Sequence, residues 1–93
     1  MFAIAFDMVI KDLKTYYGEP YNNAYYDISN VMEQCGFYRI QGSTYMTNSQ
    51  DMTSLFRVIE ALKKIDWFRK SVRDIRAFRV ENWSDFTQLM KEN

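Results

Sequence analysis

The first seven residues alternate large and small side chains, which predicts a β-strand with two unlike faces. Phe2, Ile4 and Phe6 share one face, whereas Ala3 and Ala5 share the other. A period of two places successive side chains on opposite sides of a sheet. We therefore expect the bulky face to pack against a layer of helices and the small face to stay open.

Asp7 ends this strand, and it falls on the small, open face. Two interpretations follow. An aspartate directly before a helix is a common N-cap, and a helix beginning at Met8 would use it in that way. Alternatively, a carboxylate at the end of a strand, on a face that other groups can approach closely, is suited to chemistry.

Helical spacing follows the strand twice in the first half of the chain. A weak apolar pattern predicts a short helix over residues 8–17, closed by Gly18. A second helix over residues 21–35 is indicated by an apolar stripe and by the glycine at position 36. The stripe repeats at three or four residues and consists of Tyr25, Ile28, Met32 and Cys35.

The second half of the chain predicts a hairpin, a helix and a last strand. Residues 37–40 and 44–47 read as short strands around a turn at 41–43. Asn48 or Ser49 is expected to cap the next helix, with Asp51 in its first turn. This helix is predicted to end near residues 67–68, and its apolar stripe is Met52, Leu55, Phe56, Ile59 and Leu62.

The remaining residues predict one more strand and a short terminal element. Residues 72–81 read as the last strand, although neither of its faces is cleanly apolar. Residues 84–91 are short and amphipathic, and Ser84 favours a capped helix there over a strand.

This order of elements predicts an α+β fold of the ferredoxin-like, split βαββαβ type. We expect one domain over residues 1–93, with an antiparallel sheet, helices on one face and a short C-terminal element. In this topology the first strand lies between the third and fourth strands. Asp7 is then expected near Ser43 and Tyr45 on one side and near Arg73 or Asp74 on the other.

The net charge is zero, but the charges are unevenly distributed. Residues 63–79 hold seven basic and two acidic side chains, a local net charge of +5. Such a segment is either a solvated face or a patch that contacts phosphates. Its candidate phosphate-binding residues are Arg69, Lys70, Arg73, Arg76 and Arg79.

Composition narrows the class of protein further. The aromatic fraction of 17% exceeds the needs of one small core, so we expect self-association through some of these rings. Cys35 is the only cysteine and is expected to be a small apolar residue. No leader segment or membrane span is expected, which indicates a cytoplasmic protein of a reducing compartment.

Four segments together resemble the virulence-associated protein D (VapD) family, which is itself similar to the small ferredoxin-like nucleases of CRISPR adaptation modules. The segments are FAIAFD, GEPYNNAYYDI, QGSTYM and WFRKSVRDIRAFRVENWSDFT. The resemblance implies an endoribonuclease, the toxin of a toxin–antitoxin pair with a small antitoxin protein as partner, and a homodimer. It also implies that Asp7 is the residue most closely tied to activity, with Ser43 and Tyr45 at the polar positions after the turn.

The available side chains limit the chemistry of RNA cleavage. The chain contains no histidine, which excludes histidine acid–base catalysis. Asp7 is expected either to act as a base on the ribose 2′-hydroxyl or to help hold Mg²⁺, in which case Asp7 of a second subunit is a candidate second ligand. Ser43 and Tyr45 are expected to line the cleft, and an arginine of segment 73–79 to stabilise the phosphorane. The CRISPR-type relatives often have a second acid shortly after the first, and residues 8–10 supply none.

Two other functions fit the same sequence. One is a non-catalytic RNA-binding module, in which strand aromatics stack on bases. The other is a protein-interaction module that acts through an aromatic interface. A labelled RNA separates these possibilities, because a binder shifts it and a nuclease shortens it.

Overall fold

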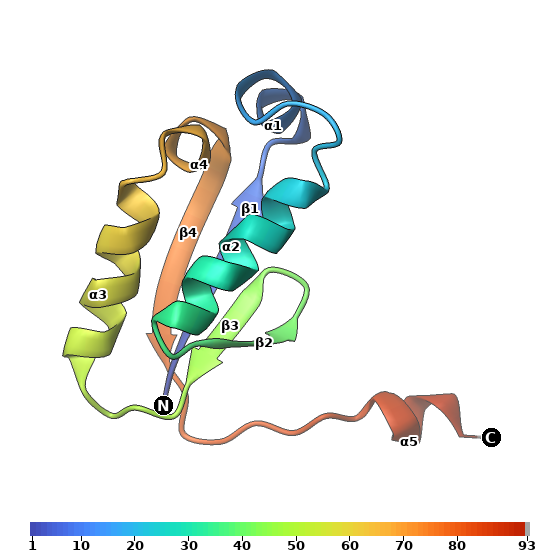
Figure 1. Cartoon of the computed structure of the whole chain (residues 1–93). Coiled ribbons are helices and arrows are strands. Elements are labelled where there is room, and N and C mark those ends of the chain that lie inside the picture. Colours follow the sequence, from blue (N-terminus) through green and yellow to red (C-terminus); the bar gives the residue numbers. More distant parts are fainter. Residues whose placement is uncertain (93) are drawn as a thin grey trace.

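The computed structural model describes residues 1–92 and shows an α+β fold with an antiparallel sheet (Figure 1). Within these residues the sheet has the strand order β2-β3-β1-β4. Its strands are β1 (Phe2–Met8), β2 (Tyr38–Gln41), β3 (Thr44–Thr47) and β4 (Val72–Arg79). The expected ferredoxin-like class and the central position of β1 between β3 and β4 are therefore confirmed. Asn93, the last residue of the predicted domain, lies outside the described residues.

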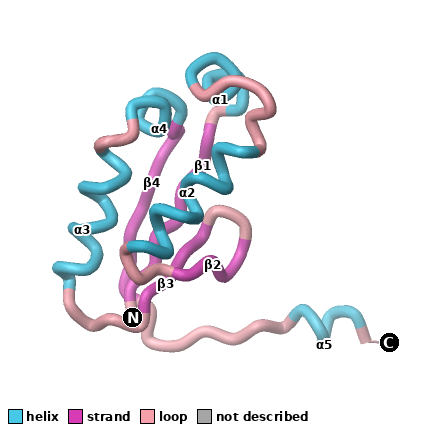
Figure 2. The backbone as a smooth tube through the Cα atoms, viewed as in Figure 1, coloured by secondary structure: helices cyan, strands magenta, loops and turns pink. Residues whose placement is uncertain are grey.

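Helices cover one face of this sheet, as Figures 1 and 2 show. The two longest helices, α2 and α3, lie across that face, and α1 and α4 lie beside the ends of β1 and β4. The helices are α1 (Ile10–Tyr16), α2 (Asn23–Gln34), α3 (Met52–Lys63), α4 (Asp66–Ser71) and α5 (Thr87–Lys91). The predicted single helical layer is confirmed.

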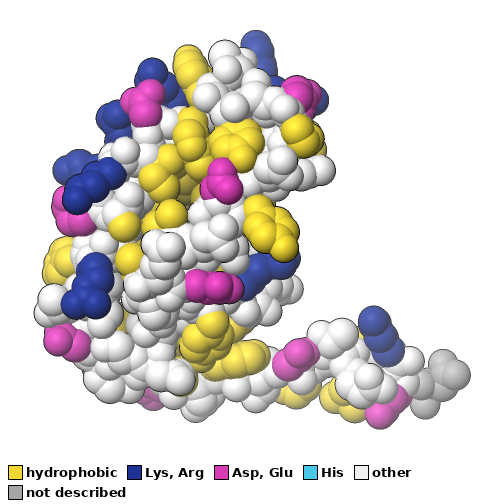
Figure 3. Space-filling view, viewed as in Figure 1, with side chains coloured by type: hydrophobic (Ala, Val, Ile, Leu, Met, Phe, Trp, Pro, Cys, Tyr) yellow, Lys and Arg dark blue, Asp and Glu magenta, His cyan; other side chains and the backbone are white. Residues whose placement is uncertain are grey.

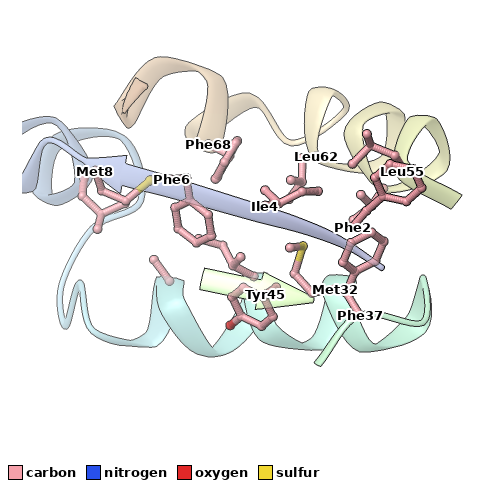
Figure 4. Packing of buried hydrophobic residues seen from close by; sticks show 14 residues of the cluster. Phe2, Ile4, Phe6, Met8, Met32, Phe37, Tyr45, Leu55, Leu62 and Phe68 are labelled. Carbon is pink, nitrogen blue, oxygen red and sulfur yellow. The ribbon is translucent and has the colours of Figure 1, made fainter. Parts of the chain in front are cut away.

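The bulky face of β1 forms the centre of the core (Figure 4). Phe2, Ile4, Phe6 and Met8 are each at most 7% exposed and lie between the sheet and the helices. Fully burying one such side chain contributes about 1.5–3 kcal/mol. The helices contribute a matching apolar set, which includes Leu13, Ala24, Ile28, Met32, Leu55, Val58, Leu62 and Phe68.

The opposite face of the sheet is apolar at one end and polar at the other. Ala3 lies opposite both Met46 and Phe78, which gives an apolar row. Asp7 lies opposite Asp74 at the other end of the face. The pairing therefore places the aspartate on a face that no helix of α1–α4 covers.

The predicted ends of α3 were wrong in two respects. Its N-cap is Asp51, whose carboxylate accepts a hydrogen bond from the Thr53 amide at 2.9 Å. Ser49 lies before the cap, and its hydroxyl accepts a hydrogen bond from the Asp51 amide at 3.1 Å. The segment at 67–68 neither ends α3 nor forms a loop, but belongs to the separate helix α4, in which Phe68 is buried. A break at residues 64–65 redirects the chain so that Phe68 reaches the core.

Two other expectations about helices fail. Met52 and Phe56 were placed on the apolar stripe of α3, yet they are 51% and 62% exposed, because Leu55, Val58 and Leu62 form the buried stripe. Ser84 does not cap the terminal helix, since α5 begins only at Thr87 and Asp85 accepts the hydrogen bond of the Thr87 amide at 2.8 Å.

Glycines are required at two chain reversals. Gly36 follows α2 with φ +81°, and its amide donates to the Glu33 carbonyl at 3.0 Å. Gly42 has φ +45° in the turn between β2 and β3. Positive φ disfavours other side chains, so these glycines set the direction in which β2 and β3 leave α2.

The chain after β4 leaves the body of the molecule. This C-terminal arm, residues 80–92, extends away from the sheet and ends in α5 (Figures 1 and 3). No residue of α5 is buried. The large apolar side chains of the arm are between 47% and 75% exposed, and they are Trp83, Phe86, Leu89 and Met90.

Candidate active site

The side chain of Asp7 is exposed at the end of β1 and makes no hydrogen bond or ion pair with any of residues 1–92. Met8 continues the strand, so α1 begins only at Ile10 and its N-cap residue is Val9. The capping interpretation of Asp7 is therefore wrong. Its carboxylate is available to a ligand.

The neighbours of Asp7 on β4 are one acid and one base. Asp74 is its register partner, and Arg76 lies opposite Ala5, on the same face. The guanidinium of Arg76 is 3.8 Å from the carboxylate of Asp74, and both side chains are largely exposed. An exposed pair at this distance is weak, so Arg76 can turn towards an anion on this face.

The β2–β3 turn borders the other side of this strand end. The amide of Phe6 donates to the carbonyl of Ser43 at 3.1 Å, which holds the turn against β1 beside Asp7. Tyr45 lies opposite Ile4, on the helical side of the sheet, and its ring stacks on Phe6 at 6.2 Å. The structure thus holds the backbone of Ser43 beside the end of β1, whereas Ser43 and Tyr45 both line the cleft on the helical side of the sheet.

A cleft of about 780 Å³ lies between α2 and the β2–β3 turn. Ser43 and Tyr45 line it on the sheet side together with Phe6, Gly42 and Arg39. The α2 side of the cleft was missed in the sequence, and it consists of Asn22, Tyr25, Tyr26, Ser29, Asn30 and Glu33.

A signal for this wall exists in the sequence. Its six residues fall at spacings of three and four, so they form one face of α2 next to the buried stripe. A face that only meets solvent usually carries long charged side chains. This face instead carries amides, hydroxyls and two tyrosines, and residues 19–34 include no lysine or arginine.

Asp7 lies close enough to the cleft to influence it electrostatically. Burial, the neighbouring Tyr21 and the negative charge of Asp7, in that order of size, raise the pKa of Tyr25. Tyr25 therefore stays protonated and can donate a hydrogen bond. Asp7 does not line the cleft itself, but its charge reaches Tyr25 on the cleft wall.

The basic segment is partly neutralised by its own acids. Arg69 and Lys70 contact Asp66 at 2.6 and 3.0 Å, one turn apart on α4. The hydrogen bond from Lys70, and then the charges of Lys70 and Arg69, lower the pKa of Asp66. Figure 3 shows basic side chains over α3 and α4 on the helical side of the molecule.

The arginines of β4 do not form a single patch. Strand alternation places Arg76 on the open face with Asp7 and Arg79 on the other face, whereas Arg73 lies at a shift in the register between β1 and β4. The guanidinium of Arg79 lies 5.5 Å from the ring centre of Phe2, a cation–π geometry. Arg76 is thus the predicted phosphate-binding residue that shares a face with Asp7.

Asp7 and Asp74 supply two carboxylates, which is as many protein ligands as Mg²⁺ usually has. This ion is usually bound by one or two carboxylates and keeps several waters or substrate phosphates. Facing carboxylates repel one another, which favours a cation between them. Residues 1–92 contain no group of three or more acidic, histidine or cysteine side chains arranged around a metal position.

Comparison with known proteins places the chain in a family. A model of the CRISPR associated protein Cas2 family matches residues 1–88. The chain is also 58% identical to Endoribonuclease VapD 1 of Riemerella anatipestifer, over 90% of this chain and 94% of that protein. Endoribonuclease VapD of Dichelobacter nodosus is 54% identical, over 98% of both chains. That of Helicobacter pylori is 50% identical, over 98% of this chain and 99% of that protein.

The chain belongs to the VapD endoribonucleases, within the fold family of Cas2. The resemblance predicted from the four sequence segments is therefore confirmed. None of the helices in residues 1–92 has the length and apolar character needed to cross a membrane.

Proposed function

We propose that this chain cleaves single-stranded RNA where β1 ends, with Asp7 as the central catalytic residue. The observation that carries the proposal is the accessible carboxylate of Asp7, which has no structural role to explain it. Its position in a family whose relatives bear the name endoribonuclease supplies the reaction class.

The chain's own residues suffice for cleavage by the ribose 2′-hydroxyl. Asp7 takes the proton of that hydroxyl while the ribose 2′-oxygen attacks phosphorus. The bond to the 5′-oxygen breaks, and that oxygen leaves with a proton from water. The products carry a 2′,3′-cyclic phosphate and a 5′-hydroxyl. No histidine competes for the role of base.

The phosphate would lie over Ala5 on the open face. Ala5 offers little bulk, Asp7 lies at the end of the strand beyond it, and Arg76 lies directly across from it on β4. A guanidinium in this position stabilises the charge that develops on the phosphorane oxygens. Ser43, whose carbonyl accepts from the Phe6 amide near this strand end, is a candidate hydrogen-bond donor to the substrate from the side of the cleft.

Mg²⁺ is a candidate cofactor of this site. Asp7 and Asp74 would hold it, and the bound ion would neutralise phosphate charge and activate water. Adding a chelator and then restoring Mg²⁺ decides whether the carboxylate acts as a base or as a ligand. RNA with 2′-O-methyl riboses gives the complementary result, because it lacks the internal nucleophile.

The test of the proposal is the variant Asp7→Asn, which keeps the size of the side chain and removes its charge. We expect RNA cleavage to be lost while circular dichroism and the elution volume stay as in the native protein. The matched control is Glu60→Gln on the exposed side of α3, which should cleave normally. Undiminished cleavage by Asp7→Asn would overturn the assignment, and binding without any cleavage by the native protein would favour an RNA-binding module.

We also propose a homodimer formed through the C-terminal arm. The arm exposes four large apolar side chains, and the open sheet face exposes Phe78 at 46% and Tyr38 at 37%. A second copy presents the same two surfaces, so a twofold arrangement covers both pairs at once. Light scattering on a chain ending at residue 82 tests this, and a dimer of unchanged stability would contradict it.

A role as the toxin of a toxin–antitoxin pair extends the proposal to the cell. The support is the VapD membership, because the toxin role follows from the resemblance to that family. Expression of the native chain should arrest growth, and Asp7→Asn should not. Relief of the arrest by a small protein that co-purifies with the chain would identify the antitoxin. Growth arrest by both the native chain and Asp7→Asn would favour a protein-interaction module.

A further inference from the structure

We infer that the cleft beside α2 is a nucleobase-binding site that selects which nucleotide is presented to Asp7. This inference deepens the proposed nuclease function and rests on it for the identity of the ligand as RNA. The cleft volume of about 780 Å³ falls in the range of small-molecule sites. Its chemistry then decides what kind of molecule fits.

The cleft wall lacks the charge that phosphate recognition requires. Among the residues that line it, Arg39 is the single cation and Glu33 the single anion. The ε-nitrogen of Arg39 already donates to the carbonyl of Gly42 at 2.7 Å. Phosphate groups are bound mainly by lysines and arginines, which leaves the sugar and the base as ligands of this wall.

The polar groups of the wall match base edges. Asn22 and Asn30 each present a donor and an acceptor, Ser29 a hydroxyl, and Glu33 an acceptor only. Single-stranded RNA is read by hydrogen bonds to base edges of this kind, combined with aromatic stacking. Along α2 these groups occur at successive turns, so several edges of one base can be contacted together.

Tyr26 supplies the stacking surface. It is 75% exposed although it lines the cleft, so its ring has little to contact in the free protein. A base laid against it would bury apolar surface of both partners. Tyr25, half-buried beside it, stays protonated and contributes a hydroxyl donor.

The cleft and the aspartate are held at a fixed separation. The Phe6 amide joins β1 to Ser43, and Ser43 lines the cleft. Tyr25 on the α2 side also senses the negative charge of Asp7, so a nucleotide bound there lies within electrostatic reach of the strand end. The base contacts decide which phosphodiester bond is cut, and the open face carries out the cutting.

The test uses nucleoside 5′-monophosphates, which contain no bond for the enzyme to cleave. Amide NMR spectra of the native chain are recorded during titration with AMP, GMP, CMP and UMP, and with ribose 5-phosphate as the ligand without a base. We expect at least one nucleotide to bind about tenfold more tightly than ribose 5-phosphate. The largest shifts should include the side-chain amides of Asn22 and Asn30.

Two variants make the result specific. Tyr26→Ala should remove most of the difference between nucleotide and ribose 5-phosphate, and it should not affect folding because the ring is exposed. Tyr16→Ala, a 49% exposed tyrosine on α1, is the matched control and should preserve the difference. Equal binding of ribose 5-phosphate, or shifts confined to β4, would overturn the inference.

Failure of this inference is distinguishable from failure of the proposed function. If nucleotides bind in the cleft but Asp7→Asn still cleaves RNA, the catalytic assignment falls and the base site stands. If Asp7→Asn is inactive but nucleotides do not bind in the cleft, the catalytic assignment stands and the base site falls. Each experiment has its own readout, because monophosphate binding involves no cleavage.

Discussion

The α2 wall of the cleft and the basic segment of residues 63–79 offer RNA two opposite kinds of surface. The segment is conspicuous in the sequence for its charge, yet in the folded chain Asp66 engages two of its cations and β4 places Arg76 and Arg79 on opposite faces. The cleft wall carries almost no charge, yet its groups converge on one hollow. Charge density therefore indicates where RNA is attracted, whereas convergence of short polar groups indicates where it is read.

The largest difference between the two surfaces should appear in salt dependence. Combining Arg73→Ala with Arg76→Ala should lower RNA affinity more than tenfold at low salt and reduce the slope of log K against log salt by about 1.4, or about 0.7 for each lost phosphate contact. Filter binding at several salt concentrations measures both quantities. Tyr26→Ala is the contrasting variant and should lower affinity by a similar factor at every salt concentration. Parallel slopes for all three proteins would remove the distinction.

The next largest effect should be a change of preference within the cleft. Glu33→Gln replaces an acceptor-only group by one that also donates, so the ranking of the four nucleotides should change by about fivefold for at least one of them. Competition of each monophosphate against a labelled RNA measures the ranking. Glu60→Gln makes the same chemical change outside the cleft and should leave the ranking intact. An unaltered ranking in both variants would show that Glu33 does not contact the base.

A smaller effect should follow from releasing the basic residues of α4. Asp66→Asn frees Arg69 and Lys70 from their ion pairs, so RNA should bind a few-fold more tightly and with a steeper salt dependence. The same filter-binding series detects this gain. Binding that weakens or stays constant would mean that these two side chains do not face the RNA.

The smallest effect concerns stability in acid. Because the folded pKa of Asp66 is below its ordinary value of 3.8, its ion pairs contribute fully above that pH and are lost as pH falls through the folded pKa. The melting temperature of the native chain should slightly exceed that of Asp66→Asn at neutral pH and converge with it in acid. Asn30→Ala in the cleft removes no titrating group, so its difference from the native chain should not change over that range. A gap for Asp66→Asn that persists in acid would contradict the assignment.

The order of strands and helices could be predicted because β1, α2 and α3 each have a clear period and turn residues separate the elements. The alternation from Phe2 to Phe6 gave the two faces of β1, and the position of β1 between β3 and β4 followed from the topology. The break between α3 and α4 was not predictable, because the apolar spacing continues across residues 64–65. Phe56 fits the stripe as well as Leu55 does, and only the tertiary packing decides that Leu55 is buried.

The candidate site was only half visible in the sequence. Asp7 and Ser43 come from strand and turn positions that the topology brings together. Tyr45 was grouped with them by its closeness in sequence, whereas alternation along β3 puts its ring on the helical side. The α2 wall was missed because the helix was predicted from its apolar stripe, and the polar residues beside that stripe were not considered. The roles of all these residues remain predictions.

The hydrogen bond between Phe6 and Ser43 has a consequence for where a long RNA would be severed. Because it joins the sheet side of the cleft directly to the strand that carries Asp7, the position of the scissile bond would lie at a constant distance along the RNA from the base bound in the cleft. A residue inserted into the turn would change that distance, so the fragment pattern would move as a set rather than become random.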